Sequence, residues 1–121
     1  MQVNTTERKQ HLKQIAETYF QALRDKNFNA IPFSDDIAFR APIAPGGAHN
    51  PIKGKTDVFE KWWKPLEPAL DGVVINILDH YYNESLTDII SKADITIAAL
   101  GITLRTADRF IINEVGKITE Q

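Results

Sequence analysis

The stretch from Ile102 to Gln121, ITLRTADRFIINEVGKITEQ, constrains the fold more than any other part of the chain. Every second residue of its first half is apolar except at two positions, which is typical of a β-strand with one face in the interior. That face carries Ile102, Leu104, Thr106, Asp108, Phe110 and Ile112. Asp108 is the only ionisable residue on it, and an isolated buried carboxylate is costly. We therefore expect Asp108 either to have a raised pKa or to lie beside a partner.

The neighbouring sequence predicts a sheet around this strand. Segments 73–82, 86–98, 102–113 and 117–121 read as successive strands. Strands joined by short turns lie antiparallel to one another. Apolar residues occur on both faces of these strands in places. We therefore expect helices to cover one face, and the second subunit of a homodimer to cover the other.

Residues 5–26 predict the longest helix, because their apolar side chains are spaced three and four apart. Tyr19 lies inside this apolar stripe, so its ring should be buried and its hydroxyl should have a partner. That partner is either ordinary backbone or water, or a functional group.

A second helix is expected from Thr56, which suits an N-cap, and Pro65 and Pro68 should limit it to about two turns. It carries the adjacent Trp62 and Trp63. Two adjacent tryptophans cannot face one direction, so one should enter the core and the other should lie near a pocket mouth or an interface.

An early strand is expected at about 36–41, with Ile37, Phe39 and Ala41 on one face. The loop 43–55 follows it, rich in glycine and proline. His49 in this loop is either simply exposed or, beside a pocket, a general acid or base. Helices first and a run of strands afterwards predict one α+β domain over residues 1–121.

Composition excludes several functions. The 14 Lys and Arg residues are outnumbered by 16 Asp and Glu, which disfavours nucleic-acid binding. The chain has no cysteine, so disulfides and thiolate chemistry are ruled out. No spacing suggests a metal site, and nothing indicates a cofactor, a membrane span or a signal peptide. A cytoplasmic location is the default expectation.

In this order and spacing, four segments resemble the nuclear-transport-factor-2-like superfamily, which includes ketosteroid isomerases, SnoaL-type polyketide cyclases and epoxide hydrolases. They are the helix with Tyr19, then FSDDIAFRAP, then KGKTDVFEKWW, then DRFIINEVGKITE. The resemblance spans nearly the whole chain. It implies a cone-shaped curved antiparallel sheet wrapped around N-terminal helices, enclosing an apolar pocket and commonly dimeric through the sheet. Fold alone does not fix function.

The resemblance to ketosteroid isomerase implies specific roles for individual residues. The family's helical tyrosine falls on Tyr19, and its neutral oxyanion-hole aspartic acid falls on Asp108. Its catalytic base, an aspartate before a proline, falls on Ala41 before Pro42. Alanine cannot take a proton, so His49 or Asp94 would have to replace this base.

Three functions therefore stay open. The first is an isomerase or cyclase acting without a cofactor on an apolar carbonyl compound, with Tyr19, Asp108 and His49 as catalytic residues. The second is a protein that binds such a ligand without chemistry, and the third is a dimerisation module. The expected pocket residues are Ile37, Phe39, Ala41, Trp62, Trp63, Asp94 and Phe110.

Overall fold

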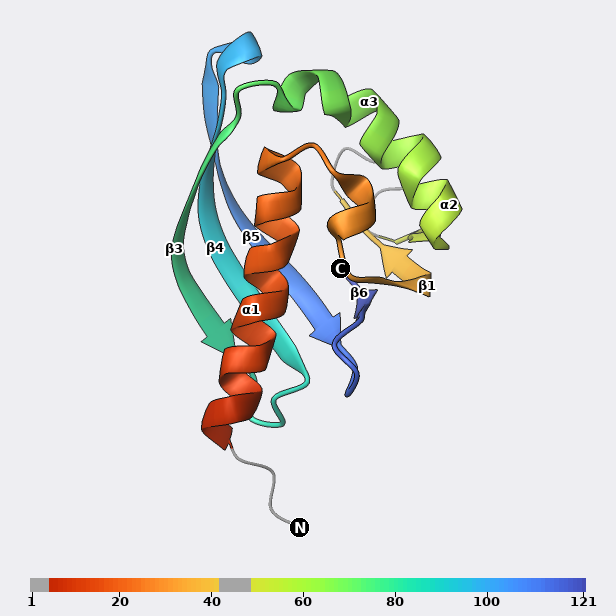
Figure 1. Cartoon of the computed structure of the whole chain (residues 1–121), viewed down its shortest axis with the longest axis vertical. Coiled ribbons are helices and arrows are strands. Elements are labelled where there is room, and N and C mark those ends of the chain that lie inside the picture. The colour runs from red at the N-terminus through yellow and green to blue at the C-terminus, as the bar shows by residue number, and fades with distance from the viewer. Residues whose placement is uncertain (1–4, 42–48) are drawn as a thin grey trace.

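The computed structural model describes residues 5–41 and 49–121 as an α+β fold (Figure 1). Pro42 and most of the predicted loop 43–55 lie outside the described residues. The elements are α1 (Thr5–Arg24), η1 (Phe28–Ala30), β1 (Phe33–Phe39), β2 (Ile52–Lys53), α2 (Lys55–Val58), η2 (Phe59–Trp63), α3 (Lys64–Leu66), η3 (Glu67–Leu70), β3 (Val74–Tyr82), β4 (Asp88–Ile97), η4 (Ala98–Leu100), β5 (Ile102–Ile112) and β6 (Ile118–Glu120). Every element expected from the sequence is present, although the early strand is Phe33–Phe39 rather than about 36–41, and β2 and η4 are additional.

The six strands form one sheet in the order β2-β1-β6-β5-β4-β3. Each neighbouring pair is antiparallel except β1 and β6, which run parallel. The antiparallel pairs predicted from short turns among residues 73–121 are confirmed. Short turns predict nothing about β1 and β6, which are joined by most of the chain. The register shifts in β3, in β1 and near the end of β5. Irregularities of this kind bend strands, and the long strands curve around α1 (Figure 1).

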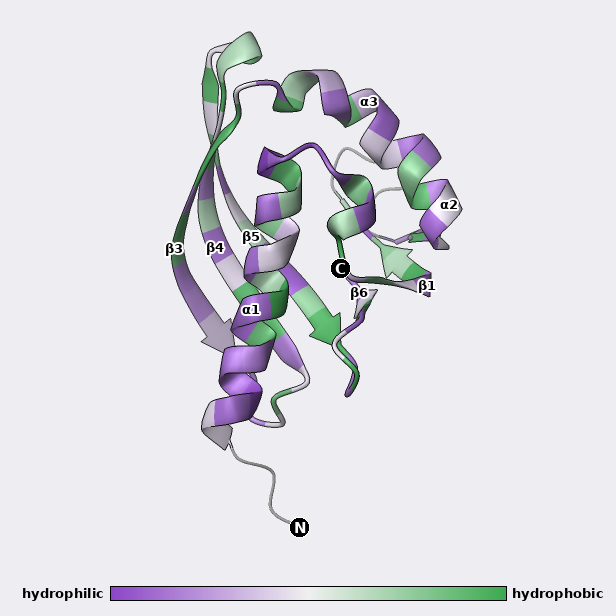
Figure 2. Ribbon diagram, in the orientation of Figure 1, coloured by the Kyte–Doolittle hydropathy of each residue, from purple (hydrophilic) through white to green (hydrophobic). Residues whose placement is uncertain are grey.

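The core lies between α1 and the concave side of the sheet. The helix buries Leu12, Ala16, Tyr19, Phe20, Ala22 and Leu23. Its outward positions are hydrophilic, and the two colours alternate along the helix in Figure 2. Phe110, Ile112 and Ile89 meet this stripe from the sheet and are at most 2% exposed. We call this side of the sheet the inner face and the opposite side the outer face.

The second helical run differs from its prediction in length. It continues from Lys55 to Leu70 through α2, a π-helical turn η2, α3 and η3. Pro65 and Pro68 do not stop it, because each lies in the first turn of a new segment, where its missing N–H removes no essential hydrogen bond. The N-cap is Gly54, with φ of 89°, rather than the predicted Thr56.

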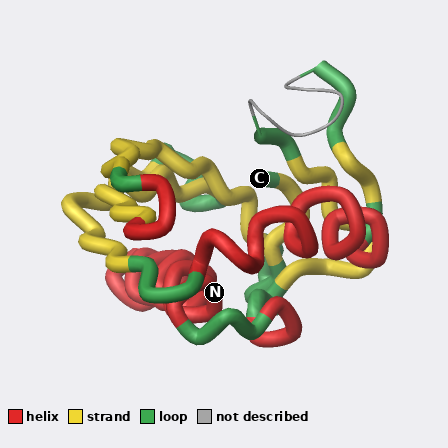
Figure 3. Tube along the Cα trace, turned by 90° about the horizontal axis from the view of Figure 1, so that it is seen from above, coloured by secondary structure: helices red, strands yellow, loops and turns green. Residues whose placement is uncertain are grey.

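This run extends from the C-terminal end of α1 toward the β1 and β2 edge of the sheet (Figure 3). It therefore covers part of the concave side beside α1, over β1 and β2. Among the described residues, no helix has the length and apolar character needed to cross a membrane.

Candidate functional site

The register of the strands decides which side chains share the inner face. Ser91 of β4 pairs with His80 of β3 and with Asp108 of β5. Directly paired residues project to the same face of a sheet. Because Ser91 is fully buried beneath α1, all three residues lie on the inner face.

Burial along the inner face of β5 falls from one end of the strand to the other. Ile112 and Phe110 are at most 2% exposed, whereas Leu104 and Ile102 are 44% and 41% exposed. Asp108 is half-buried at the boundary between these two regions. The inner face therefore leaves the core at Asp108 and continues as an uncovered apolar strip.

Tyr19 projects from α1 toward this boundary and is held by aromatic packing. Its ring centroid lies 5.0 Å from that of Phe110 and 5.1 Å from that of Phe20, both in edge-on geometry. Trp62 stacks on it nearly in parallel at 6.4 Å. The ring is 3% exposed, so its position is fixed by its neighbours rather than by solvent.

Asp108 lies close enough to Tyr19 to influence the ionisation of the tyrosine. Burial raises the pKa of Tyr19 well above its usual value, and the negative charge of Asp108 raises it further. A hydrogen bond from Gln121 opposes both effects. The Tyr19 hydroxyl is therefore a neutral hydrogen-bond donor at physiological pH.

Burial also raises the pKa of Asp108, and this is the largest influence on it. Thr106 Oγ1 donates to Asp108 Oδ2 at 3.1 Å, and Gln121 Nε2 donates to Asp108 Oδ1 at 3.5 Å. These two hydrogen bonds favour the carboxylate and lower the pKa, but less than burial raises it. The sequence-based expectation for Asp108 thus agrees with its surroundings.

The apolar residues expected around this pair differ in burial and in their contacts. Ile37, Phe39 and Phe110 are buried. Ala41 and Trp62 are half-buried against the core, and the Trp62 ring centroid lies 4.5 Å from that of Phe39. Trp63 is 1% exposed, contacts Phe28 and donates its indole N–H to Glu67 Oε2 at 2.8 Å. Trp63 is thus the tryptophan that enters the core, and Trp62 is the one beside Tyr19.

Asp94 does not lie with the pair, contrary to the prediction. It is paired with Arg105 on β5, three positions from Ser91 and so on the outer face. Both Asp94 oxygens accept hydrogen bonds from Arg105, at 2.7 Å and 2.9 Å, and this lowers the Asp94 pKa. An ionised, ion-paired carboxylate on the outer face cannot replace a base on the inner face.

His49 is exposed, and the residues that precede it lie outside the described part of the chain. The structure describes no contact between His49 and Tyr19 or Asp108, so it does not support an acid–base role for His49. The catalytic assignment of His49 stays a prediction.

Sequence reasoning placed His80 in a polar network but missed its partners, which form a polar chain next to Asp108. Ser91 Oγ lies 2.8 Å from His80 Nδ1, and His80 Nε2 lies 3.4 Å from Glu17 Oε2 on α1. Ser91 is 0% exposed, so it is a packed structural hydroxyl rather than an accessible nucleophile. The signal was present in the sequence, because Ser91 interrupts the apolar inner positions of β4, but only the register connects it with His80.

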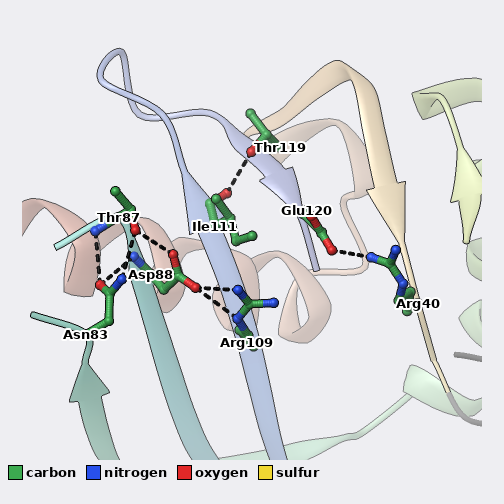
Figure 4. A network of polar contacts seen from close by, with 8 residues as sticks. All are labelled: Arg40, Asn83, Thr87, Asp88, Arg109, Ile111, Thr119 and Glu120. Atoms are coloured by element: carbon green, nitrogen blue, oxygen red, sulfur yellow. Dashed lines mark hydrogen bonds and ion pairs between the residues drawn. The ribbon is translucent and has the colours of Figure 1, made fainter. Parts of the chain in front are cut away.

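The outer face carries a different set of contacts. Asp88 accepts hydrogen bonds from Arg109, whose Nη2 lies 2.6 Å from Asp88 Oδ2, and also from Thr87 (Figure 4). Arg40 and Glu120 form a second ion pair there. Exposed apolar residues lie among these charges, including Tyr81 and Ile90 at 44% and 39% exposure.

Two other features bear on the chemistry. In residues 5–41 and 49–121, no three His, Asp or Glu side chains converge as metal ligands would.

A solvent-open hollow between the start of α1 and the β3–β4 turn is lined by Arg8, His11, Leu86 and their neighbours. Arg8 fills part of it and donates to the carbonyls of Leu86 and Ile112, both at 2.9 Å, so this region anchors the helix.

Comparison with known proteins identifies the fold. No protein-family model matches the chain, and no curated protein matches its sequence. Among solved structures, an NTF2-like protein from Cytophaga hutchinsonii superposes with a TM-score of 0.64 at 16% identity, over 99% of this chain and 88% of that one. The Δ5-3-ketosteroid isomerase from a Mycobacterium species superposes with a TM-score of 0.66 at 15% identity, over 91% and 88%.

A third structure was solved both alone and with a ligand. RV0760c from Mycobacterium tuberculosis superposes with a TM-score of 0.70 at 13% identity, over 91% of this chain and 86% of that one. Its complex with estradiol-17β-hemisuccinate superposes with a TM-score of 0.65 at 14% identity, over 91% and 89%. The chain therefore has the nuclear-transport-factor-2-like fold, as its sequence motifs indicated.

Proposed function

We propose that this protein binds a small apolar molecule through one oxygen atom, which accepts hydrogen bonds from Tyr19 and from a neutral Asp108. The observation that carries this proposal is the placement of Tyr19 beside Asp108 at the end of an aromatic core formed with Trp62 and Phe110, where burial raises the pKa of both polar residues. Two neutral donors placed side by side would suit a carbonyl, enol or phenol oxygen. Burial makes such hydrogen bonds stronger than they would be in water.

The uncovered apolar strip beyond Asp108 supports an apolar ligand. Leu104 and Ile102 continue the inner face of β5 and are exposed. Their apolar side chains would be removed from water by an apolar ligand. Two residues of a strand span about 7 Å, so the strip from Asp108 to Ile102 is about 20 Å long. A fused-ring compound of steroid size would contact Trp62 and this strip while its oxygen reaches Tyr19 and Asp108.

Binding without catalysis is favoured over an isomerase or cyclase reaction. Ala41 occupies the place of the base in the resembling isomerases and is half-buried against the core. Asp94 is ion-paired on the outer face, and His49 is exposed. The structure therefore gives no support for Asp94 or His49 as a base beside Asp108. Two hydrogen-bond donors without a base can hold a ligand oxygen but cannot remove a proton.

We further propose that the protein acts as a homodimer in the cytoplasm. The outer face combines exposed apolar residues with paired charges of both signs, among them Asp88 with Arg109 and Asp94 with Arg105. A second copy would cover the apolar part and complement the charges. The dimer interface would not block the ligand site, because the interface lies on the outer face of the sheet and the ligand site lies on the inner face.

The test uses estradiol-17β-hemisuccinate, the compound bound by the structurally similar RV0760c. Saturable one-to-one binding in isothermal titration calorimetry is expected, and Asp108→Leu should weaken it at least about tenfold. The matched control is Asp94→Leu, which removes an aspartate from the outer face and should leave affinity unchanged. Equal affinity in the wild type and Asp108→Leu would refute the proposal.

A further inference from the structure

Gln121 is fixed beside the Tyr19–Asp108 pair by its backbone. Its N–H donates to the Ala38 carbonyl at 3.0 Å, and its carbonyl accepts from the Arg40 N–H at 2.8 Å. These two bonds continue the pairing of β6 with β1 beyond Glu120. The direction of the Gln121 side chain is therefore set by the sheet.

The two ends of the Gln121 amide have different surroundings. The nitrogen end faces the pair, since Nε2 donates to Asp108 Oδ1 at 3.5 Å and a hydrogen bond from Gln121 lowers the pKa of Tyr19. The oxygen end, Oε1, is buried without a hydrogen-bond partner. Among residues 5–41 and 49–121, Ser34 Oγ is the only other buried side-chain atom in this condition.

A buried acceptor without a partner is destabilising, and native proteins nearly always satisfy such atoms with a protein group, a water molecule or a ligand. Tyr19 and a neutral Asp108 offer hydrogens to a ligand, whereas Gln121 Oε1 needs one. A ketone satisfies only the two donors. A hydroxyl group satisfies all three positions, because its oxygen accepts and its hydrogen donates.

We propose that Gln121 determines ligand specificity, selecting a molecule whose polar end is a hydroxyl group, such as a phenol, enol or alcohol, over one that ends in a ketone. This inference rests on the proposed function and adds the chemical class of the bound group. A site with a buried polar group discriminates strongly against a ligand that leaves the group unpaired.

The experiment compares two probes with the same fused two-ring skeleton, the phenol 2-naphthol and the ketone 2-tetralone. Dissociation constants are measured for the wild type, Gln121→Leu and Gln121→Met by titration calorimetry. Gln14→Leu is the matched control, since Gln14 is exposed on the outward side of α1. Gln121→Met keeps the side-chain length and Gln121→Leu is one atom shorter, and thermal unfolding confirms that each variant is folded.

The wild type is expected to bind 2-naphthol more tightly than 2-tetralone. Both Gln121 variants should weaken 2-naphthol binding about tenfold and change 2-tetralone binding less than about twofold, because only the hydroxyl hydrogen loses its acceptor. Gln14→Leu should change neither. An unchanged ratio between the probes, or a larger loss for 2-tetralone, would overturn the role of Gln121 alone. Failure of the wild type to bind either probe would instead refute the proposed function, and this inference with it.

Discussion

The hydroxyl of Tyr19 on α1 and the carboxyl of Asp108 on β5 lie close enough that the charge of Asp108 raises the pKa of Tyr19. The two residues are 89 positions apart in sequence and come from opposite layers of the fold. Both have raised pKa values, with burial as the largest cause. Ionisation of both groups at once is therefore disfavoured, and the proposed site requires Asp108 in its neutral form.

Replacing Asp108 with Asn tests the protonation state through stability. The folded-state pKa of Asp108 is raised, so the native state resists ionisation more than the unfolded state does, for which the pKa is about 3.9. The carboxyl therefore costs stability as pH rises above that value, and the cost is absent below it. Asp108→Asn should unfold at an equal or higher temperature than the wild type between pH 5 and 8.

The control for this experiment is Asp94→Asn. The pKa of Asp94 is lowered by Arg105, so the ionised Asp94 carboxylate stabilises the folded state, and this stabilisation is lost as pH falls. Because the pair is exposed on the outer face, its effect on the unfolding temperature should be small. A large loss of stability in Asp108→Asn at pH 7 would mean that Asp108 is an ionised structural carboxylate.

Tyr19→Phe should separate the hydroxyl from the ring. The edge-on contacts with Phe20 and Phe110 need only the ring, so the free energy of unfolding should fall by no more than about 1 kcal/mol. Tyr19→Ala removes the ring as well and should cost about 3–5 kcal/mol. Urea unfolding measures both values, and similar losses in the two variants would show that the hydroxyl, rather than the ring, holds this part of the core.

Ser91→Ala should be destabilising although the change is small. It leaves His80 Nδ1 without its 2.8 Å partner in a buried position, which costs about 1–3 kcal/mol. Thr96→Val is the matched control on the same strand, since the Thr96 hydroxyl bonds to Thr103 on the outer face. The control should stay within about 0.5 kcal/mol of the wild type in urea unfolding. Equal effects of the two substitutions would show that the His80 chain is not structural.

The sequence predicted the face of β5 and the stripe of α1 because both patterns are local. Asp108 and Tyr19 were identified from their own neighbours, at spacings of two and of three to four residues. Asp94 was misplaced because its face depends on the register between β4 and β5. That register is set by the η4 turn at Ala98–Leu100, whose conformation the alternation of residues does not encode.

Gln121 and the Ser91–His80 contact were missed for a related reason. Both depend on contacts between segments that are far apart in the chain. No local spacing distinguishes Gln121 from an ordinary polar residue at the end of a strand. The length of the second helical run was underestimated because a proline in the first turn of a segment resembles a helix breaker in sequence. Only the π-helical turn before Pro65 shows how the run continues.

The proposed homodimer is tested by light scattering at micromolar concentration. Ile90→Asp places a charge on the outer face between Tyr81 and Arg109 and should convert a dimer to a monomer. Val115→Asp is the control, because Val115 is 78% exposed in the turn before β6. A wild type that is monomeric at ordinary salt concentrations would remove the dimer from this account.

Restoring a carboxylate at Ala41 tests the distinction between binding and catalysis. The wild type should not exchange the α-hydrogens of 2-tetralone for deuterium faster than buffer does. Ala41→Asp should accelerate the exchange, because it restores a carboxylate at the position that corresponds to the base of ketosteroid isomerases. Proton NMR follows the exchange, with Ala107→Asp on the outer face as the control. Rapid exchange by the wild type would show that another group already acts as a base.

The shared oxygen site of Tyr19 and Asp108 is tested most directly by a double-mutant cycle. The dissociation constant of 2-naphthol is measured for the wild type, Tyr19→Phe, Asp108→Leu and the double variant. If both residues donate to one ligand oxygen, each single variant should bind about tenfold more weakly, and the double variant should depart from additivity by about 0.5 kcal/mol or more. Wild-type affinity in both single variants would contradict the account.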